Sequence, residues 1–432
     1  MPSSSDACGL VLAAPSSGSG KTLTTLALLR ALKNKGYAVA GAKCGPDYID
    51  PKFHEAASGK ASYNLDGYSM PQEALCHWAY EAARDSDLLL VEGAMGLFDG
   101  AANDTGSAAD VAEALDLPVV LIVDCKGLGQ SIAAIIAGFS TFRQTTRIGG
   151  VILNRVGSAR HFDILKSALQ KLDVPLVGHI RTSSELVLPS RHLGLVQAEE
   201  HNDLDVFLDR AAQQILRHLD LDMLIAMASP IQSKEKPVSS LPPLGQNIAI
   251  ARDEAFAFCY PHMLKSWQQA GTTIKFFSPL NDEGPNPDAD AVFLPGGYPE
   301  LYAGRLANAE QFRVSMENAR SRNALIYGEC GGYMVLGKWL VCGQKQTHRM
   351  LGFLPLETSF AERKLHLGYR RLTPLDADVW TGQLPAHEFH YATTMRAAGA
   401  EPLFRAQDAL GQDLGDIGLR VGSTFGSFAH LI

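Results

Sequence analysis

The sequence lacks paired cysteines, long basic clusters and long apolar runs. Its seven cysteines are scattered over 432 residues without a C-x-x-C pair, which argues against a disulfide framework and against a structural zinc site. The formal net charge is −8 and no basic cluster exceeds one helix face, so nucleic acid is not expected as the main partner. The longest apolar run, 117–123, ends at Asp124 and is too short to span a bilayer.

The N-terminal segment also lacks the features of a targeting sequence. The stretch "MPSSSDACGL" has neither a basic region nor a long apolar region, so we expect no signal peptide and a cytoplasmic location. With 46% hydrophobic and 19% charged residues, the composition predicts a soluble globular protein. The length predicts two domains or more.

Apolar runs alternate with helical patterns through the first half of the chain. Near-continuous runs rich in Val, Ile and Leu are typical of parallel strands that are buried on both faces of a sheet. We therefore predict an α/β domain with a doubly wound parallel sheet over 7–227. The predicted strands are 10–15, 38–46, 88–93, 118–124, 148–156 and 175–180.

A second α/β domain is predicted after a linker. Residues 228–246 collect Pro, Ser and Lys with little periodicity, as linkers do. Alternation resumes over 247–432, where 367–375 and 387–394 are predicted to form antiparallel strands of an added β layer. The predicted parallel strands are 247–253, 273–279, 291–297 and 324–330.

A phosphate-binding loop follows the first predicted strand and opens a helix. In "AAPSSGSGKT" the glycines let backbone N–H groups face phosphate oxygens, the lysine reaches the terminal phosphates, and the threonine can ligate Mg²⁺. Pro15 replaces the first glycine of G-x-x-x-x-G-K-[ST], so a small-residue turn that only resembles the motif is the alternative. The predicted ATP-binding residues of the loop are Gly18, Ser19, Gly20, Lys21 and Thr22.

Polar side chains end three of the predicted strands. Asp47 and Asp50 follow the second strand, and Glu92 and Asp99 follow the third. Ligands of open parallel sheets gather at the carboxyl ends of the strands, so we predict Asp47 and Glu92, with the loop threonine, as Mg²⁺ ligands. For Asp99 a solvated loop acid or a helix cap is an equal interpretation. Asn154 is predicted to contact the adenine edge, with a turn-forming asparagine as the alternative.

The stretch "YGECGGYMVLG" surrounds Cys330 with glycines, after a short apolar run. A structural cysteine needs no such neighbours, whereas a nucleophile on a tight strand-to-helix turn does. The N-terminal dipole of the following helix is expected to lower the pKa of this thiol. Gly296 and Gly297 end another strand, and their N–H groups are predicted to form an oxyanion hole for acyl transfer.

The general base for this thiol must come from elsewhere in the chain. His430, after a short apolar segment near the C-terminus, is the predicted base, with His387 and His390 as competitors. The H-x-x-H spacing of the two competitors falls on a predicted strand rather than on a helix, so we predict no metal site there.

These motifs carry a resemblance to a known family. The C-terminal half resembles a class I glutamine amidotransferase, and the N-terminal half resembles the dethiobiotin-synthetase-type P-loop fold. Together with "GPDYIDPKFHEAASG", "VEGAMGLFDG", "LPGGYPELYA", "LGYRRL" and "AHEFHYATT", the whole chain resembles the a,c-diamide synthases of cobalamin biosynthesis. Within that family "SELVLPSRHLGLVQAEEH", "ARDEAFAFCY" and "GSFAHLI" look closest to aerobic-pathway members, which act on hydrogenobyrinic acid; cobyrinic acid, with cobalt, is the alternative substrate.

The resemblance implies a reaction scheme. ATP phosphorylates a corrinoid carboxylate, Cys330 releases ammonia from L-glutamine, and ammonia reaches the acyl phosphate by a sheltered route. Tyr48, Ile49 and Asp50 are expected near the activated carboxylate. Cations for the ring carboxylates are offered by "LPSRHLG" (Arg191, His192) and "GYRR" (Arg370, Arg371), which could equally be surface charges or intradomain pairs. A homodimer is a further expectation.

One position departs from the usual amidotransferase triad. That triad has His-x-Glu, in which the glutamate orients the imidazole, but position 432 is Ile. We therefore expect an unoriented imidazole and a weaker glutaminase. The alternatives to the diamide synthase are a different amidoligase, similar to CTP synthase, and a P-loop regulatory ATPase of the partitioning type, which would lack the cysteine elbow.

Overall fold

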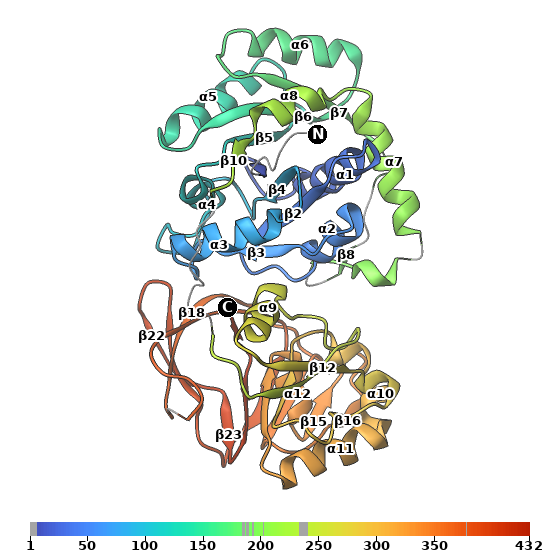
Figure 1. The fold of residues 1–432 in the computed structure, drawn as a ribbon, viewed down its shortest axis with the longest axis vertical. Helices are drawn as coiled ribbons and strands as arrows, with labels where there is room; N and C mark the ends of the chain where they lie inside the picture. Colours follow the sequence, from blue (N-terminus) through green and yellow to red (C-terminus); the bar gives the residue numbers. More distant parts are fainter. Residues whose placement is uncertain are drawn as a thin grey trace. The chain divides into compact units, whose positions relative to one another are not determined.

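The computed structural model describes residues 7–183, 186, 190–191, 194–201, 203–232, 241–376 and 378–432. The chain divides into two compact units, 1–238 and 239–432, and each is built around its own central sheet (Figure 1). Among the described helices, none combines the length and the apolar character that a membrane crossing requires.

The first unit contains a sheet in the order β3-β2-β4-β1-β5-β6-β7, in which every neighbouring pair is parallel. Six of these strands lie where the apolar runs predicted them. The short strand β3 was not predicted, and β10 pairs antiparallel with β1. The bounds are β1 Cys8–Ala13, β2 Val39–Cys44, β3 Tyr63–Leu65, β4 Leu88–Glu92, β5 Val119–Asp124, β6 Ile148–Val156, β7 Leu176–Arg181 and β10 Ser229–Pro230. Two shorter strands, β8 Ser190–Arg191 and β9 Gly194–Leu195, pair separately.

Helices cover both faces of this sheet, which confirms the doubly wound prediction. Apolar residues of α3, α4, α5 and α6 form one core with alternate residues of the strands, while α1, α2 and α7 pack together on the opposite side (Figure 1). Such two-sided burial explains why the strands are apolar at nearly every position. The bounds are α1 Lys21–Asn34, α2 Asp50–Ser58, α3 Gln72–Ala83, α4 Ala108–Leu115, α5 Ile132–Phe142, α6 Ala159–Leu169, α7 Leu204–Leu216, α8 Leu221–Met227 and the 3₁₀ turn η1 Ala198–Glu200.

The second unit has a six-stranded sheet in the order β12-β11-β13-β14-β24-β23. The first five strands are parallel, and β23 is antiparallel to β24. The strands are β11 Asn247–Ala251, β12 Thr273–Phe277, β13 Ala291–Leu294, β14 Leu325–Glu329, β23 Leu419–Val421 and β24 Thr424–Ser427. The helices are α9 Pro261–Gln269, α10 Ala303–Asn308, α11 Glu310–Ser321 and α12 Gly331–Leu336, with 3₁₀ turns η2 Pro279–Asn281 and η3 Pro299–Leu301.

Two smaller sheets complete this unit. One has the order β22-β21-β18-β19-β25 and is antiparallel throughout. It contains most of the predicted strand 367–375 in β18 and the first part of the predicted strand 387–394 in β19, whereas residues 393–394 begin β20 of the other sheet. The other has the order β16-β15-β17-β20. Their strands are β15 Trp339–Val341, β16 Thr347–Arg349, β17 Leu356–Ser359, β18 His366–Pro374, β19 Leu384–His390, β20 Thr393–Ala397, β21 Phe404–Asp408, β22 Asp413–Ile417 and β25 His430–Leu431.

Candidate functional site

A pocket of about 530 Å³ opens at the phosphate loop between β1 and α1. Its lining includes Gly18, Gly20, Lys21 and Thr22, together with residues at or just after the ends of β4, β6 and β7. All of these lie at the carboxyl ends of parallel strands, where ligands of doubly wound sheets bind. The volume falls within the range of about 300–1,000 Å³ that is usual for small-molecule sites.

Lys21 and Asn154 hold the loop in shape. The ammonium of Lys21 donates to the carbonyls of Met95 and Ser16, and burial, followed by the nearby positive charge of Lys43, lowers its pKa. The amide Nδ2 of Asn154 donates to the carbonyl of Ser19 at 2.8 Å. Gly20 has φ 90°, and a Cβ there would overlap this amide nitrogen. Asn154 thus clamps the loop, and its predicted contact with adenine stays a prediction.

Thr22, Asp50 and Glu92 bring their side-chain oxygens together beside the loop. The hydroxyl of Thr22 donates to Oε1 of Glu92 at 2.6 Å and lies 3.3 Å from Oδ2 of Asp50. Burial, followed by the negative charge of Asp47, raises the pKa of Asp50 to about 7. Burial also opposes ionisation of Glu92, but Lys43 and His54 outweigh it and hold the pKa of Glu92 well below its usual range.

Two residues of this cluster were missed by the sequence analysis. Lys43 bridges the carboxylates, with Nζ 2.5 Å from Asp50 Oδ2 and 2.8 Å from Glu92 Oε1. The pKa of Lys43 is well above its usual value, because the attraction of the two carboxylates outweighs the opposing effect of burial. His54 lies 2.7 Å from Oε2 of Glu92 through Nε2 and 3.2 Å from the Ser62 hydroxyl through Nδ1. The signal available in the sequence was a charged residue, Lys43, near the end of the apolar predicted strand 38–46.

Asp47 and Asp50 have different hydrogen-bond partners at the start of α2. One carboxylate oxygen of Asp47 accepts the backbone N–H groups of Ile49 and Asp50, at 2.8 and 3.0 Å, at the start of α2. Asp50, predicted near the substrate, is the acid that contacts Thr22, whereas Asp47 was predicted as the metal ligand. Ile49 is buried and Tyr48 is half-buried, and their contact with substrate stays a prediction.

Asp99 forms a local turn. Its Oδ2 accepts the N–H of Gly96 at 2.9 Å, which agrees with the loop-acid interpretation.

Cys330 sits on a tight strand-to-helix turn between β14 and α12. Its backbone has φ 45° and ψ −101°, and its N–H donates to the carbonyl of Ser427 at 2.8 Å. The glycines are required by close packing of backbones, because a Cβ on Gly332 would clash with the carbonyl oxygen of Leu294. This conformation is the sharp elbow that the sequence pattern predicted.

The expected low pKa of Cys330 is wrong for this structure. The side chain is 2% exposed, and burial, followed by the negative charge of Glu300, raises the pKa of the thiol above its usual value. Helix α12 spans only six residues, and the N–H of Gly331 is too small an influence to offset burial. A thiol of this kind needs a base to take its proton.

Among the three candidate histidines, His430 lies beside Gly296 together with Cys330. A Cβ placed on Gly296 would lie 3.1 Å from Nε2 of His430 and 3.4 Å from Cβ of Cys330, so both side chains border one point. Of the competitors, His390 has Nε2 2.9 Å from Glu388. His387 is the register partner of His430 between β19 and β25, and burial lowers its pKa to about 3.

The imidazole of His430 has a carboxylate beside it, contrary to the expectation from Ile432. Oε2 of Glu329 lies 3.5 Å from Nδ1 of His430. This glutamate directly precedes Cys330 and reaches the histidine because β24 lies next to β14 and leads to β25. A carboxylate thus lies near the imidazole although position 432 is Ile, and the expectation of a weaker glutaminase stays a prediction.

The backbone N–H groups near the thiol come from two turns. A Cβ on Gly331 would lie 2.9 Å from the nitrogen of Gly297, so the turn after Cys330 meets the glycine pair. The carbonyl of Gly296 accepts the N–H of Phe258 at 2.9 Å, which fixes that pair. Gly331 is a residue that the sequence analysis missed, although the N–H after a nucleophile is a common oxyanion donor.

Of Arg191 and Arg370, two predicted corrinoid contacts, only Arg370 has a described side chain. Arg370 donates to Glu388 at 2.8 Å through Nε and at 2.7 Å through a terminal nitrogen, so it forms an intradomain pair. The backbone of Arg191 belongs to β8, but its side chain and all of His192 lie outside the described residues. The contacts of both arginines with substrate stay predictions.

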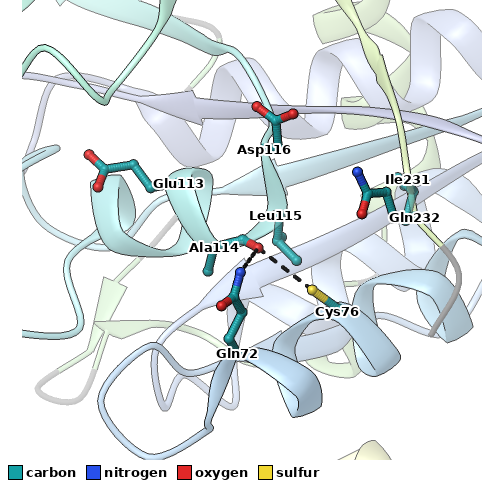
Figure 2. Close-up of a pocket in the computed structure, with 8 residues that line it drawn as sticks. All are labelled: Gln72, Cys76, Glu113, Ala114, Leu115, Asp116, Ile231 and Gln232. Carbon is teal, nitrogen blue, oxygen red and sulfur yellow. Dashed lines mark hydrogen bonds between the residues drawn. The ribbon is translucent and has the colours of Figure 1, made fainter. Parts of the chain in front are cut away.

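A second pocket, of about 230 Å³, lies at the opposite, amino ends of the strands (Figure 2). There Gln72 and Cys76 donate to the carbonyl of Ala114 near the end of α4. Asp116 and Ile231 complete a lining that contains no residue of the phosphate loop or of the elbow. We assign this pocket no part in the chemistry.

Comparisons with known proteins agree with this pair of sites. Residues 10–196 match a family described as the CobQ/CobB/MinD/ParA nucleotide binding domain, and residues 247–432 match the CobB/CobQ-like glutamine amidotransferase domain. The chain is 54% identical over 424 residues to a protein of Rhizobium meliloti (strain 1021) named hydrogenobyrinate a,c-diamide synthase, with 98% of this chain and 99% of the relative covered. A protein of the same name from Rhodobacter capsulatus is 46% identical, with 98% of both chains covered.

Proposed function

This chain belongs to the hydrogenobyrinate a,c-diamide synthase family, and from that membership we propose how its two sites amidate the a and c carboxylates of hydrogenobyrinic acid with ATP and glutamine. The observation that carries the proposal is the presence, on one chain, of a phosphate loop with convergent carboxylates and a cysteine elbow with a histidine. A regulatory ATPase needs only the first, and the match to an amidotransferase domain accounts for the second.

The N-terminal unit activates the carboxylate. A carboxylate oxygen of the corrinoid attacks the γ-phosphorus of ATP, the bond to the β,γ-bridging oxygen breaks, and ADP leaves behind an acyl phosphate. Lys21 faces the terminal phosphates from the loop, and Lys43 brings a second positive charge to the same pocket. Positive charge is needed there because negative charge spreads over the phosphoryl oxygens during transfer.

The oxygen donors beside the loop fit Mg²⁺. The hydroxyl of Thr22 and the carboxylates of Asp50 and Glu92 converge within hydrogen-bond distance, and hard oxygen donors suit this ion. We propose these three residues as its ligands, with Asp47 next to them. Mg²⁺, when bound, supplies neutralisation of phosphate charge.

The C-terminal unit releases ammonia. His430 takes the proton of Cys330, the sulfur attacks the side-chain amide carbon of glutamine, and the carbon–nitrogen bond breaks as His430 returns the proton to the leaving nitrogen. Backbone N–H groups of Gly297 and Gly331 are the proposed oxyanion donors, with Gly296 shaping the turn. Water then hydrolyses the thioester to glutamate, and ammonia displaces phosphate from the acyl phosphate to give the amide.

Mass spectrometry of the corrinoid product tests this function. The protein is incubated with ATP, MgCl₂ and glutamine, and with either hydrogenobyrinic acid or cobyrinic acid. We expect two carboxylates to become amides on hydrogenobyrinic acid, no product with the Lys21→Ala variant, and loss of glutamine-dependent product with Cys330→Ala. Amidation of cobyrinic acid alone would reassign the substrate, and no amidation of either corrinoid would refute the proposal.

We also propose a cytoplasmic location and a homodimer. ATP and glutamine are cytoplasmic metabolites, and several apolar residues of α5, among them Ala134, Ile135 and Phe142, are partly or fully exposed, which favours burial of this helix against another copy. Analytical ultracentrifugation of wild type and Phe142→Ser would detect a dimer that depends on this helix.

A further inference from the structure

We propose that Glu329 is the positioning residue of the glutaminase, in place of the carboxylate that class I amidotransferases carry two residues after the histidine. The inference rests on the proposed glutaminase function and adds one group to it. Glu329 acts through His430 and does not touch the reacting atoms.

The carboxylate of Glu329 is held firmly in a buried setting. The residue is 3% exposed, and its Oε1 accepts two hydrogen bonds, from the hydroxyl of Tyr327 at 3.0 Å and from the N–H of Leu431 at 3.0 Å. Both donors are fixed by the fold, since Tyr327 precedes it on β14 and Leu431 belongs to β25. Such donors compensate a buried carboxylate for the hydrogen bonds it loses with water.

The second oxygen of Glu329 faces the imidazole. Oε2 lies 3.5 Å from Nδ1 of His430, while Nε2 lies on the side of Gly296 and Cys330. The two ring nitrogens therefore point to different partners, in the order thiol, imidazole, carboxylate. A distance of 3.5 Å is longer than a settled hydrogen bond, but catalytic hydrogen bonds commonly shorten once substrate binds.

This order has a chemical consequence. A carboxylate that accepts from Nδ1–H selects the tautomer in which Nε2 is unprotonated, so Nε2 can take the proton of Cys330. The same carboxylate stabilises the imidazolium that forms while the thiol attacks glutamine. Because the thiol is buried and its pKa is raised, proton transfer to an oriented base matters more here than in a site with a ready thiolate.

The His-x-Glu sequence pattern does not reveal that Glu329 lies beside His430. The residue two positions after His430 is Ile432, whereas Glu329 lies about a hundred residues upstream in the chain. Strands β14 and β24 are parallel neighbours with Glu329 opposite Ser427, and the chain turns after Ser427 to place His430 on β25. The carboxylate thus comes from the strand that carries the nucleophile.

Steady-state kinetics of Glu329→Gln and Glu329→Asp test the proposal. The glutamine variant keeps the shape and an acceptor for Leu431 but removes the charge, and the aspartate variant keeps the charge on a shorter side chain. We expect Glu329→Gln to lower kcat for glutamine hydrolysis by about 10²-fold, within the range that acid–base catalysis contributes, with KM changed by less than about twofold. Glu329→Asp should retain more activity than Glu329→Gln. Glu317→Gln, on an exposed turn of α11, is the matched control and should behave as wild type.

The ranking of the two variants separates positioning from packing. If Glu329 only fills space and bonds to its neighbours, the isosteric glutamine would retain more activity than aspartate, and that ranking, or a kcat of Glu329→Gln within about threefold of wild type, overturns the proposal. Amidation with NH₄Cl instead of glutamine should be equal in all variants, which shows that the N-terminal unit works and that the proteins are folded. Absence of that reaction in wild type would instead refute the proposed function.

Discussion

Replacing Lys43 by methionine tests the buried charge cluster beside the phosphate loop. The side chain of Lys43 is 6% exposed, and its ammonium contacts Asp50 at 2.5 Å and Glu92 at 2.8 Å. Removing one partner of a buried ion pair costs about 3–5 kcal/mol because the other charge stays buried. Here Thr22 and His54 still contact Glu92, so we expect the lower end, about 3 kcal/mol in the free energy of unfolding of the N-terminal unit.

The cost should depend on pH with a definite sign. Burial raises the pKa of Asp50 to about 7 although Lys43 lowers it, so without Lys43 the folded chain holds this proton to a higher pH than wild type does, while the unfolded chain releases it. The Lys43→Met penalty should therefore be larger at pH 8 than at pH 6.

Amide hydrogen exchange of peptides from β2 and β4, in EDTA, measures this penalty within the full chain. Lys52→Met is the control, because Lys52 pairs with Glu55 at 3.1 Å on the surface, and we expect a loss below about 0.5 kcal/mol. A Lys43→Met penalty under about 1 kcal/mol at pH 8, or one that grows on acidification, would refute the reasoning.

Three other predictions concern the C-terminal unit. Burial lowers the pKa of His262 and of His387 to about 3, so both histidines stay neutral in the folded chain at pH 5, whereas in the unfolded chain they bind protons below about pH 6.5. The free energy of unfolding should therefore fall by up to about 2 kcal/mol per histidine between pH 7 and pH 5. Urea unfolding at pH 7 and 5 measures this loss, and His262→Gln should reduce it; an unchanged loss would contradict the assignment. Because burial raises the pKa of Cys330, its alkylation by iodoacetamide, followed by peptide mass spectrometry, should still accelerate through pH 9; a plateau below pH 8 would contradict this. Gly332→Ala would place a Cβ against the carbonyl of Leu294 and should destabilise the unit by about 3 kcal/mol. The control Gly138→Ala lies in α5, where nothing is within 4 Å of the added Cβ, and should be neutral or slightly stabilising. Equal melting temperatures for the two variants would contradict this explanation of the glycines.

Strands with continuous apolar runs could be predicted from the sequence. In β6 the run "IGGVILNRV" coincides with the strand Ile148–Val156, because two-sided burial in a parallel sheet keeps the strand apolar up to its polar end at Asn154 and Arg155. Strand β3, Tyr63–Leu65, has only three residues and no run of its own. In the C-terminal unit β20 has mostly exposed residues, "TTMRA", so its pairing with β17 is set by tertiary contacts that no local pattern reveals.

In the two sites, too, short motifs could be predicted from the sequence, whereas contacts between distant segments could not. The phosphate loop and the cysteine elbow are formed by contiguous residues, so a motif predicts them. The partners of these motifs depend on register between strands: Lys43 pairs with Glu92 across β2 and β4, and Glu329 reaches His430 only through β24. Asp47 and Asp50 show the same at the start of α2, where Asp47 accepts two backbone N–H groups and Asp50 lies near Thr22, a difference that their spacing in the sequence does not reveal.

The most direct test of the account follows nitrogen from glutamine to the corrinoid. The protein is incubated with hydrogenobyrinic acid, ATP, MgCl₂ and glutamine that carries ¹⁵N at the side-chain amide. Unlabelled NH₄Cl is present at a concentration near that of glutamine, and the mass of the product is measured by mass spectrometry. The account predicts a diamide that carries ¹⁵N at both new amides in wild type, and only unlabelled diamide with Cys330→Ala. A wild-type diamide without ¹⁵N, or a labelled diamide from Cys330→Ala, would contradict it.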